Sequence, residues 1–297
     1  MGLRLKQFQS LIKLQMKNRP YISTLCFSGI PISKIVKMAK LNDFKIEFSS
    51  GLPYNKSNIE FFDKFNVSSK LIHNYFPAPK NPFVINLASS NKKIRDLSIN
   101  HCLKNIELSA KNNLNFYAAH AGFCVDPLPD NLGRFIQIKK PFNRAAHIDI
   151  FLNSLNQLIN FAESLKVNFY IENNVVSKLN YTNNGNTNSF ICCDSDEINY
   201  VFSQIKSEYF GLLLDTAHLK VSSSTLSLDM YDEVNKIIPT IRAIHHSDND
   251  GLIDSNHPLD SNYWFLKFKE YFHLWQHVIE VKNIEIDKIK EQMSILN

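Results

Sequence analysis

The sequence predicts an α/β protein, a single-domain (β/α)8 TIM barrel. The first observation is a rhythm of eight short segments rich in β-branched and aromatic residues, each followed by a helical pattern or a long loop. The second is the length of 297 residues, which suits one domain of this kind. The third is that no G-x-G-x-x-G or G-K-[ST] segment occurs, which argues against an open doubly wound sheet and against a P-loop nucleotide site.

The predicted strands and helices alternate along the chain. The strands are expected at residues 21–27, 44–48, 69–73, 114–120, 167–172, 211–214, 241–245 and 276–280. Helical patterns are expected at residues 32–41, 58–65, 90–112, 148–165, 195–206, 228–238, 262–270 and 284–296, with long loops at 121–143 and 173–191. Residues 1–20 form a basic lead-in, and residues 21–297 form the barrel. Asp194 and Glu197 have the spacing of a capping box.

Composition argues against several classes of protein. The formal net charge of +5 is small for a nucleic-acid-binding protein, and no run of about 18 apolar residues is present that would span a membrane. The five cysteines include no C-x-x-C pair, which favours reduced thiols and a cytoplasmic location. Cys192 and Cys193 are interpreted as two small buried residues, because adjacent cysteines rarely bridge.

Imidazoles and carboxylates stand where the predicted strands end. These residues are His73, His120, Glu172, Asp215 with His218 just beyond it, His245 and Glu280. The carboxyl ends of barrel strands meet at one rim, where barrel enzymes carry their active sites. A lone histidine there is usually a hydrogen-bonded core residue, and Asp215 has an alternative role as a helix cap. Glu47 is interpreted as a supporting or surface charge. Since so many buried ionisable groups are costly without a cation, the pattern predicts a site for Zn, Mn, Fe or Co.

Short motifs over most of the chain resemble those of the xylose-isomerase-like barrel superfamily. They are Ile72-His73, His120-Ala121-Gly122, Ile171-Glu172-Asn173, Leu214-Asp215-Thr216-Ala217-His218, Ile244-His245-His246-Ser247-Asp248-Asn249 and Ile279-Glu280. The superfamily includes sugar isomerases and epimerases as well as endonuclease IV. The resemblance runs from about residue 21 to residue 280 and implies a metal-dependent barrel enzyme.

The resemblance implies a divalent metal ion held by Glu172, Asp215, His245 and Glu280. His245 is preferred to His246 because it lies three residues before Asp248, as in the family pattern, and because neighbouring strand residues point to opposite faces. His218 is then expected beside the metal. Further candidates for a substrate contact or an additional metal are His73, His120, His257 and Asp254, although the spacing from Asp254 to His257 is one residue longer than in the family.

Two reactions fit such a rim. In the first, a sugar or sugar derivative is isomerised or epimerised: the metal ion polarises a carbonyl, Glu172 and Glu280 remove and return a proton at the neighbouring carbon, and His218 stabilises the developing oxyanion. The alternative is an endonuclease IV-like zinc phosphodiesterase at abasic DNA sites. That enzyme needs three zinc ions, and His73, His120, His218 and His257 would be its additional ligands. A barrel that only binds a metabolite is a third interpretation, against which the intact ligand set argues.

The sugar reaction is favoured because the net charge is small and no basic run interleaved with aromatic residues follows the first two strands. The segments His73-Asn74-Tyr75-Phe76-Pro77 and His120-Ala121-Gly122-Phe123 also resemble bacterial barrel proteins associated with surface-polysaccharide synthesis, which implies a sugar or nucleotide-sugar substrate. Arg95, Arg134, Lys139 and Lys140 are interpreted as solvated charges and not as a phosphate site. We expect a small-molecule sugar partner, neither nucleic acid nor membrane, and a chain compatible with a homodimer.

Overall fold

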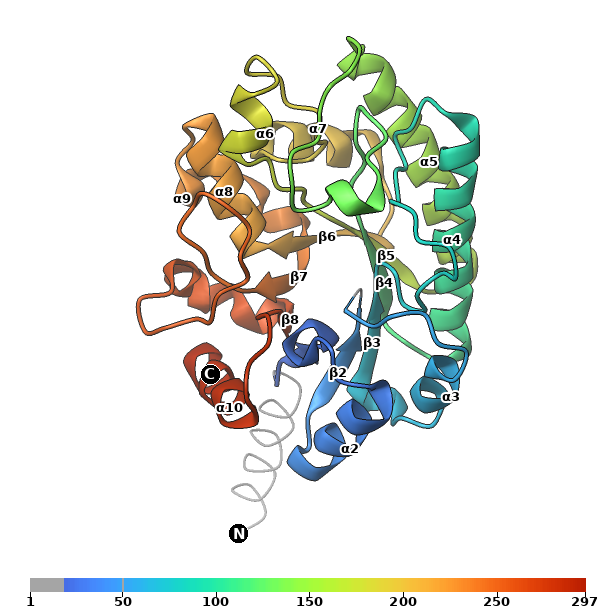
Figure 1. Cartoon of the computed structure of the whole chain (residues 1–297), viewed down its shortest axis with the longest axis vertical. Helices are drawn as coiled ribbons and strands as arrows, with labels where there is room; N and C mark the ends of the chain where they lie inside the picture. Colours follow the sequence, from blue (N-terminus) through green and yellow to red (C-terminus); the bar gives the residue numbers. More distant parts are fainter. Residues whose placement is uncertain (1–18, 50) are drawn as a thin grey trace.

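The centre of the molecule is a closed barrel of eight parallel strands (Figure 1). The computed structural model describes residues 19–49 and 51–297, so residues 1–18 of the predicted lead-in lie outside the described residues. Each strand pairs with the next one in the chain, and β8 closes on β1. The strands are β1 Tyr21–Ser23, β2 Lys45–Phe48, β3 Lys70–His73, β4 Phe116–His120, β5 Asn168–Glu172, β6 Phe210–Asp215, β7 Ile241–His246 and β8 Gln276–Ile279. The predicted TIM barrel is confirmed.

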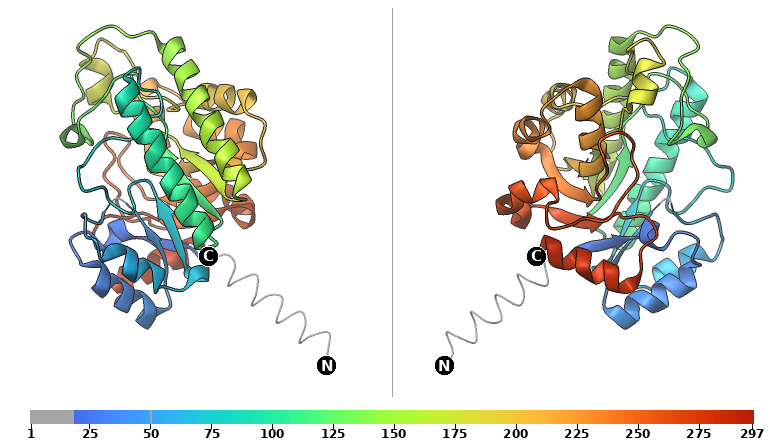
Figure 2. Two further views of the ribbon diagram at one scale, coloured as in Figure 1. Left: turned by 90° about the vertical axis from the view of Figure 1, so that its right-hand side faces the viewer. Right: turned by 60° about the vertical axis from the view of Figure 1, so that its left-hand side comes forward.

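Helices surround the barrel on its outside, as the two side views in Figure 2 show. The α-helices are α2 Ile32–Asn42, α3 Asn58–Asp63, α4 Lys92–Lys111, α5 Arg144–Ser164, α6 Lys178–Thr182, α7 Ser195–Gln204, α8 Thr216–Leu226, α9 Met230–Ile237 and α10 Ile286–Leu296. The 3-10 helices are η1 Thr24–Phe27, η2 Val67–Ser69, η3 Pro129–Asn131, η4 Ile238–Thr240 and the longer η5 Trp264–Leu274. Within the described part of the chain, no helix is long and apolar enough to cross a membrane.

The structure contains α8, which the predicted helical patterns lack, and three predicted elements differ from what was expected. Local hydrogen bonds explain two of these three differences. The first strand ends at Ser23, whose hydroxyl accepts a bond from the Leu25 N–H and starts η1 where the sequence predicts further strand. The loop predicted at 173–191 contains α6, which Ser177 caps. The helix predicted at 262–270 is the 3-10 helix η5, which begins at Trp264.

The predicted capping box at the start of α7 is half formed. The Asp194 carboxylate accepts a bond of 2.9 Å from the Glu197 N–H, as a capping residue does. The Glu197 carboxylate instead accepts two bonds of 2.8 Å from the Arg144 guanidinium and one of 2.6 Å from the Cys192 N–H. Arg144 also donates to the Phe190 carbonyl, so this pair ties the long loop after β5 to the starts of α5 and α7.

The inside of the barrel holds a buried cluster of side chains, the inner layer, which lies below the rim residues. The buried inner cluster consists of Tyr21, Leu71, Phe116, Ala118, Tyr170, Leu213, Ala243 and Val278. The intervening residues of the strands, such as Ile72 and Leu214, face outward and join the large core under the helices. Because side chains alternate along a strand, the residues two positions after the inner layer also point inward, at the carboxyl end of the barrel.

Candidate metal centre

This alternation delivers the predicted site residues to one rim. His73 follows Leu71 by two positions, and Glu172, Asp215, His245 and Glu280 stand in the same relation to inner-layer residues of β5 to β8. The pairing register brings His120 opposite Glu172 and Asp215 opposite His245. The alternation of side chains along each strand and the pairing register between strands therefore bring these side chains together at one rim.

Four of them form a tight group around one imidazole nitrogen. The Nδ1 atom of His245 lies 2.6 Å from Glu280 Oε2, 3.1 Å from Glu172 Oε1 and 4.0 Å from Asp215 Oδ2. One ligand atom from each of the four residues lies within 4.8 Å of the others. Ligands about 2.1 Å from a common ion are about 3.4 Å apart in a tetrahedral site, so this spacing suits a single divalent cation.

Asp215 Oδ2 is buried and has no hydrogen-bond partner, and the close contacts of His245 Nδ1 and Glu172 Oε2 do not have hydrogen-bond geometry. Buried polar atoms are normally paired, and three carboxylates held this close repel one another without a cation between them. The donor set of one imidazole and three carboxylates is one that Zn, Mn, Fe or Co accepts. The residues present therefore fit a metal ion.

Glu47 supports the opposite edge of the His245 ring. Its Oε2 atom lies 3.1 Å from His245 Nε2, and both side chains are fully buried. A carboxylate on the second nitrogen of a metal-binding histidine fixes the ring orientation and its tautomer. Glu47 is thus no surface charge. The signal that could have shown this was an acidic side chain at an inward position of a strand whose neighbours Ile46 and Phe48 face the outer core.

Asp215 combines the two roles that its sequence context left open. Its Oδ1 atom accepts a bond of 2.8 Å from the His218 N–H and caps α8. Its Oδ2 atom is the one that faces His245 without a hydrogen-bond partner. A carboxylate has two oxygens, so capping the helix and facing the group of ligands are compatible.

His73 and His120 form a second group on the other side of Glu172. His73 Nε2 lies 3.1 Å and His120 Nδ1 lies 3.0 Å from Glu172 Oε2. These three residues also meet the spacing of a metal site, and so do Glu47, His73 and His245. The candidate centre is therefore a chain of adjoining groups that share Glu172 and His245.

His218 and Asp254 lie together next to this chain, whereas His257 does not. His218 Nδ1 donates to the Asn173 carbonyl at 2.8 Å, and His218 Nε2 lies 3.2 Å from Asp254 Oδ2. His257 is exposed, and its backbone pairs with that of Asp248. It belongs to none of the three candidate metal groups found among residues 19–49 and 51–297.

The charges of the group shift one another's proton affinities. Burial raises the pKa of Asp215 to about 7, against the opposing charge of His218. Burial lowers the pKa of His245, but the surrounding carboxylates, Glu280 first, raise it well above its usual range. Burial raises the pKa of Glu172, yet His120, His73 and His245 bring it well below the usual value. The metal-free centre therefore holds protons that a cation would displace.

His246 points away from the centre, as strand alternation predicts. Its Nδ1 atom lies 3.0 Å from the Tyr263 hydroxyl, and its Nε2 atom lies 2.8 Å from His277 Nδ1. Burial lowers its pKa well below the usual value. His246 is thus a neutral residue of the outer core, and His245 is the one that faces the rim.

The model of the xylose isomerase-like TIM barrel family matches residues 48–278. The chain belongs to this family. None of the curated proteins compared with the sequence matches it. Among solved structures, a D-tagatose 3-epimerase-like protein superposes with a TM-score of 0.67 at 17% identity, covering 94% of this chain and 95% of its own.

Two further structures share the fold of this family. The 3-keto-D-glucoside 4-epimerase of E. coli has a TM-score of 0.64 at 12% identity, with 94% of this chain and 97% of that chain covered. A Thermus thermophilus protein soaked with ZnCl2 has a TM-score of 0.61 at 14% identity, with 93% of this chain and 97% of that chain covered. Identities this low establish the shared barrel and leave the reaction to the site itself.

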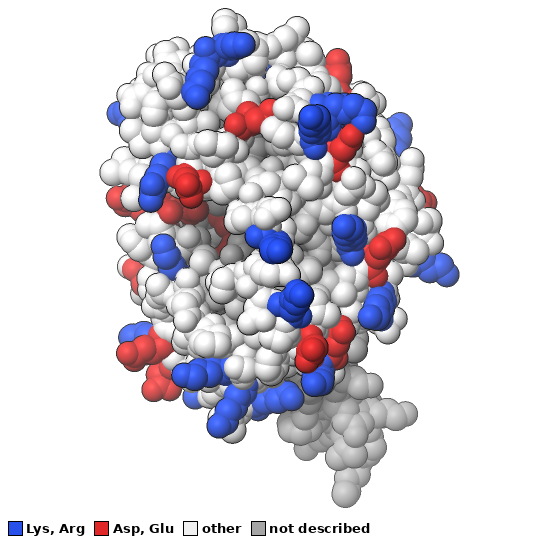
Figure 3. All heavy atoms as spheres, turned by 45° about the vertical axis from the view of Figure 1, so that its right-hand side comes forward, with Lys and Arg blue, Asp and Glu red and all other residues white. Residues whose placement is uncertain are grey.

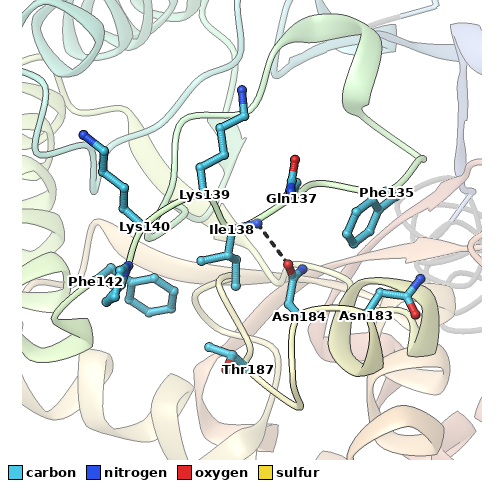
Figure 4. A pocket seen from close by; sticks show the side chains of 10 residues that line it. Phe135, Gln137, Ile138, Lys139, Lys140, Phe142, Asn183, Asn184 and Thr187 are labelled. Carbon is cyan, nitrogen blue, oxygen red and sulfur yellow. Dashed lines mark hydrogen bonds between the residues drawn. The ribbon is translucent and has the colours of Figure 1, made fainter.

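The long segments after β4 and β5 extend above the rim that carries the candidate metal centre. A cavity of about 370 Å³ lies between them, and His120, His218 and Asp254 line its inner end. A second hollow lies farther out on the same loops, where the Ile138 N–H donates to Asn184 Oδ1 at 2.9 Å (Figure 4). Lys139 and Lys140 border this hollow but extend away from Asn184, so they do not converge on one anion (Figure 4).

Charges on the surface are mixed in sign. On the face that Figure 3 shows, Lys and Arg side chains are scattered among Asp and Glu side chains and form no continuous basic stripe. A protein that tracks a nucleic-acid backbone usually carries such a stripe. This face therefore offers no support for nucleic-acid binding.

Proposed function

We propose that the chain is a metal-dependent isomerase or epimerase that acts on a sugar or sugar derivative. The observation that carries the proposal is the group of Glu172, Asp215, His245 and Glu280, in which two glutamates approach one imidazole nitrogen within 3.1 Å. The proposal is also supported by similar structures, which include a D-tagatose 3-epimerase-like protein, an L-ribulose 3-epimerase and a D-psicose 3-epimerase. A role in surface-polysaccharide metabolism stays a prediction.

The two glutamates are the groups that we assign to proton transfer. A divalent ion held by the four residues would polarise a substrate carbonyl and acidify the neighbouring C–H. Glu172 ends β5 and Glu280 directly follows β8, three strands farther round the barrel, and we assign their carboxylates to opposite faces of the substrate. One removes a proton from carbon and the other returns it, which inverts a stereocentre or moves the carbonyl.

His218 is assigned to the substrate oxygen that gains negative charge. Its Nδ1–H donates a hydrogen bond to the Asn173 carbonyl, and its Nε2 atom faces Asp254 and the cavity. Burial lowers the pKa of His218, but Asp215 and Asp254 raise it well above its usual range. A protonated imidazole in this position donates a hydrogen bond to an oxyanion.

The test is exchange of a substrate hydrogen with solvent. The metal-loaded protein is incubated in D₂O with D-tagatose, L-ribulose, D-psicose and D-fructose, and deuterium at carbon is followed by NMR. Wild type should incorporate deuterium, whereas Glu172→Gln and Glu280→Gln should each lose at least ~100-fold of the rate. Glu270→Gln, at an exposed position of η5, is the matched control. Full exchange in both site variants would contradict the two-glutamate mechanism.

The second candidate function is an endonuclease IV-like zinc phosphodiesterase. The observation that favours it is the adjoining group of His73, His120 and Glu172, which could hold a further metal ion. Against it stands the exposed position of His257, which that function would need as a ligand. Three zinc ions per chain together with incision of an abasic-site duplex would favour this function, and one divalent ion per chain without incision would favour the sugar reaction.

A further inference from the structure

The cavity above the candidate metal centre has two chemically different ends. Its volume of about 370 Å³ falls within the range of sites that enclose small-molecule ligands. At its inner end lie Asn74, His120, His218 and Asp254, and His120 also contacts Glu172 of the candidate centre. A molecule bound at the centre therefore extends outward into this cavity.

The inner end is lined by polar side chains. Asp254 is half-buried, and its Oδ2 atom lies 3.2 Å from His218 Nε2, with His120 on the same part of the wall. Carboxylates and imidazoles bind the hydroxyl groups of a sugar by hydrogen bonds. The inner end of the cavity thus matches a polyhydroxylated group.

The outer end is apolar, and three separate segments that follow strands contribute to it. Leu132 belongs to the segment after β4, Leu179 to α6 in the segment after β5, and Ile253 to the segment after β7, and all three line the cavity. They are 41%, 48% and 57% exposed, which is unusual for three large apolar side chains that border one cavity. Phe123, Ile136 and Phe190 continue this wall inward and belong to a buried apolar cluster of the loops.

Polar groups on the outer wall are already engaged by the protein. Asn180 accepts a bond of 2.7 Å from the Ile136 N–H and donates one of 3.1 Å to the Arg134 carbonyl. The Tyr75 hydroxyl accepts a bond of 2.6 Å from the Ile85 N–H. The guanidinium of Arg134 belongs to an exposed residue and can remain in water while the wall is covered. A second sugar ring would find few unused partners here.

We propose that the substrate is a sugar that holds a carbonyl group and also carries an apolar substituent, such as an alkyl or aryl glycoside with a ketone in its ring. The sugar occupies the inner end beside His120, His218 and Asp254, and the substituent covers Leu132, Leu179 and Ile253. A monosaccharide alone would leave these three side chains in water. This inference rests on the proposed sugar chemistry and adds a determinant of substrate choice, which lies in the loops and not in the candidate metal ligands.

The test compares two glycosides that differ only in the substituent. Methyl and hexyl β-D-glucopyranoside, with 1-hexanol as a third probe, are titrated calorimetrically into the Mn²⁺-loaded full-length protein. The hexyl glycoside should bind at least ~10-fold more tightly than the methyl glycoside, because its additional methylene groups leave water. 1-Hexanol should bind more weakly than the hexyl glycoside, since it has no ring hydroxyl groups to form hydrogen bonds with His120, His218 and Asp254.

Variants locate the effect on the outer wall. Leu179→Ser and Ile253→Ser should each weaken hexyl glycoside binding by about 3–10-fold and leave methyl glycoside binding unchanged. Leu41→Ser is the control, because Leu41 is 75% exposed on α2 and does not line the cavity. Equal affinities of the two glycosides, absence of binding by both, 1-hexanol binding as tight as that of the hexyl glycoside, or wall variants that behave like Leu41→Ser would each overturn the inference. The proposed isomerase reaction is judged separately, by deuterium exchange into free ketoses.

Discussion

Asp215 allows the helix cap and the candidate metal ligand to be separated by substitution. Asp215→Asn keeps an oxygen that can accept the bond from the His218 N–H, and it replaces the unpaired Oδ2 by an amide that a cation does not bind. Asp215→Ala removes both functions. Loss of a helix cap costs about 1 kcal/mol, so the metal-free Ala variant should melt about 2–4 °C below the Asn variant. The metal-free Asn variant should melt no lower than wild type, since it removes a carboxylate whose ionisation burial opposes.

The metal-loaded proteins should diverge in the opposite direction. At a metal concentration of 100 times the dissociation constant, wild type gains about 2.7 kcal/mol, which corresponds to about 5–10 °C. If loss of the ligand weakens binding about 100-fold, the Asn variant gains only about 0.4 kcal/mol at the same concentration, or about 1 °C. Differential scanning fluorimetry after chelation and titration with Mn²⁺, Co²⁺ or Zn²⁺ measures these gains. A full gain in the Asn variant would refute the ligand role, and equal melting of the Asn and Ala variants would refute the cap.

Three further predictions follow from the same geometry. Glu47→Gln should weaken metal binding about 10–100-fold in the same titration with little change in metal-free stability, because Glu47 orients His245 from behind. The metal-free protein should lose stability between pH 6 and pH 8. The raised pKa values of Asp215, His218 and His245 mean that the folded state keeps protons which the unfolded chain has already released. Urea denaturation at each pH measures the free energy of unfolding, and a rise of this free energy with pH would contradict the prediction. Arg144→Met should lower stability by about 2 kcal/mol in urea denaturation, because it strands the partly buried Glu197 carboxylate.

The strand pattern was sufficient to predict the barrel and the residues that gather at its rim. Alternation along a strand is a strict rule, so a residue two positions beyond an inner-layer side chain must also face inward. This rule separated His245 from His246, and the structure has them on opposite faces. The same rule brings His73, His120 and Glu172 together without any knowledge of the loops.

Features that depend on short-range geometry could not be predicted in this way. Strand β1 ends early because the Ser23 hydroxyl accepts a hydrogen bond from the Leu25 N–H and starts η1, although the residues that follow favour a strand. The position of His257 depends on the turn that pairs it with Asp248, and spacing alone does not determine such a turn. The roles of the two Asp215 oxygens, one as helix cap and one facing His245, depend on atomic positions that a sequence pattern does not specify. The cavity walls come from loops whose sequences carry no periodic pattern.

The order of the strands in the barrel has a consequence for how the chain folds. The four candidate ligands lie at or directly after the ends of β5, β6, β7 and β8, which are neighbours in the barrel as well as in the chain. The seam between β8 and β1 joins residues at opposite ends of the chain, and the bond from Ser23 to Glu280 crosses it over 257 positions. Closing so long a loop is entropically slow compared with pairing adjacent strands. A half-barrel of the last four strands can therefore bring its carboxylates together before the ring closes, and a metal ion present during refolding would favour that half as the nucleus on which the first four strands assemble.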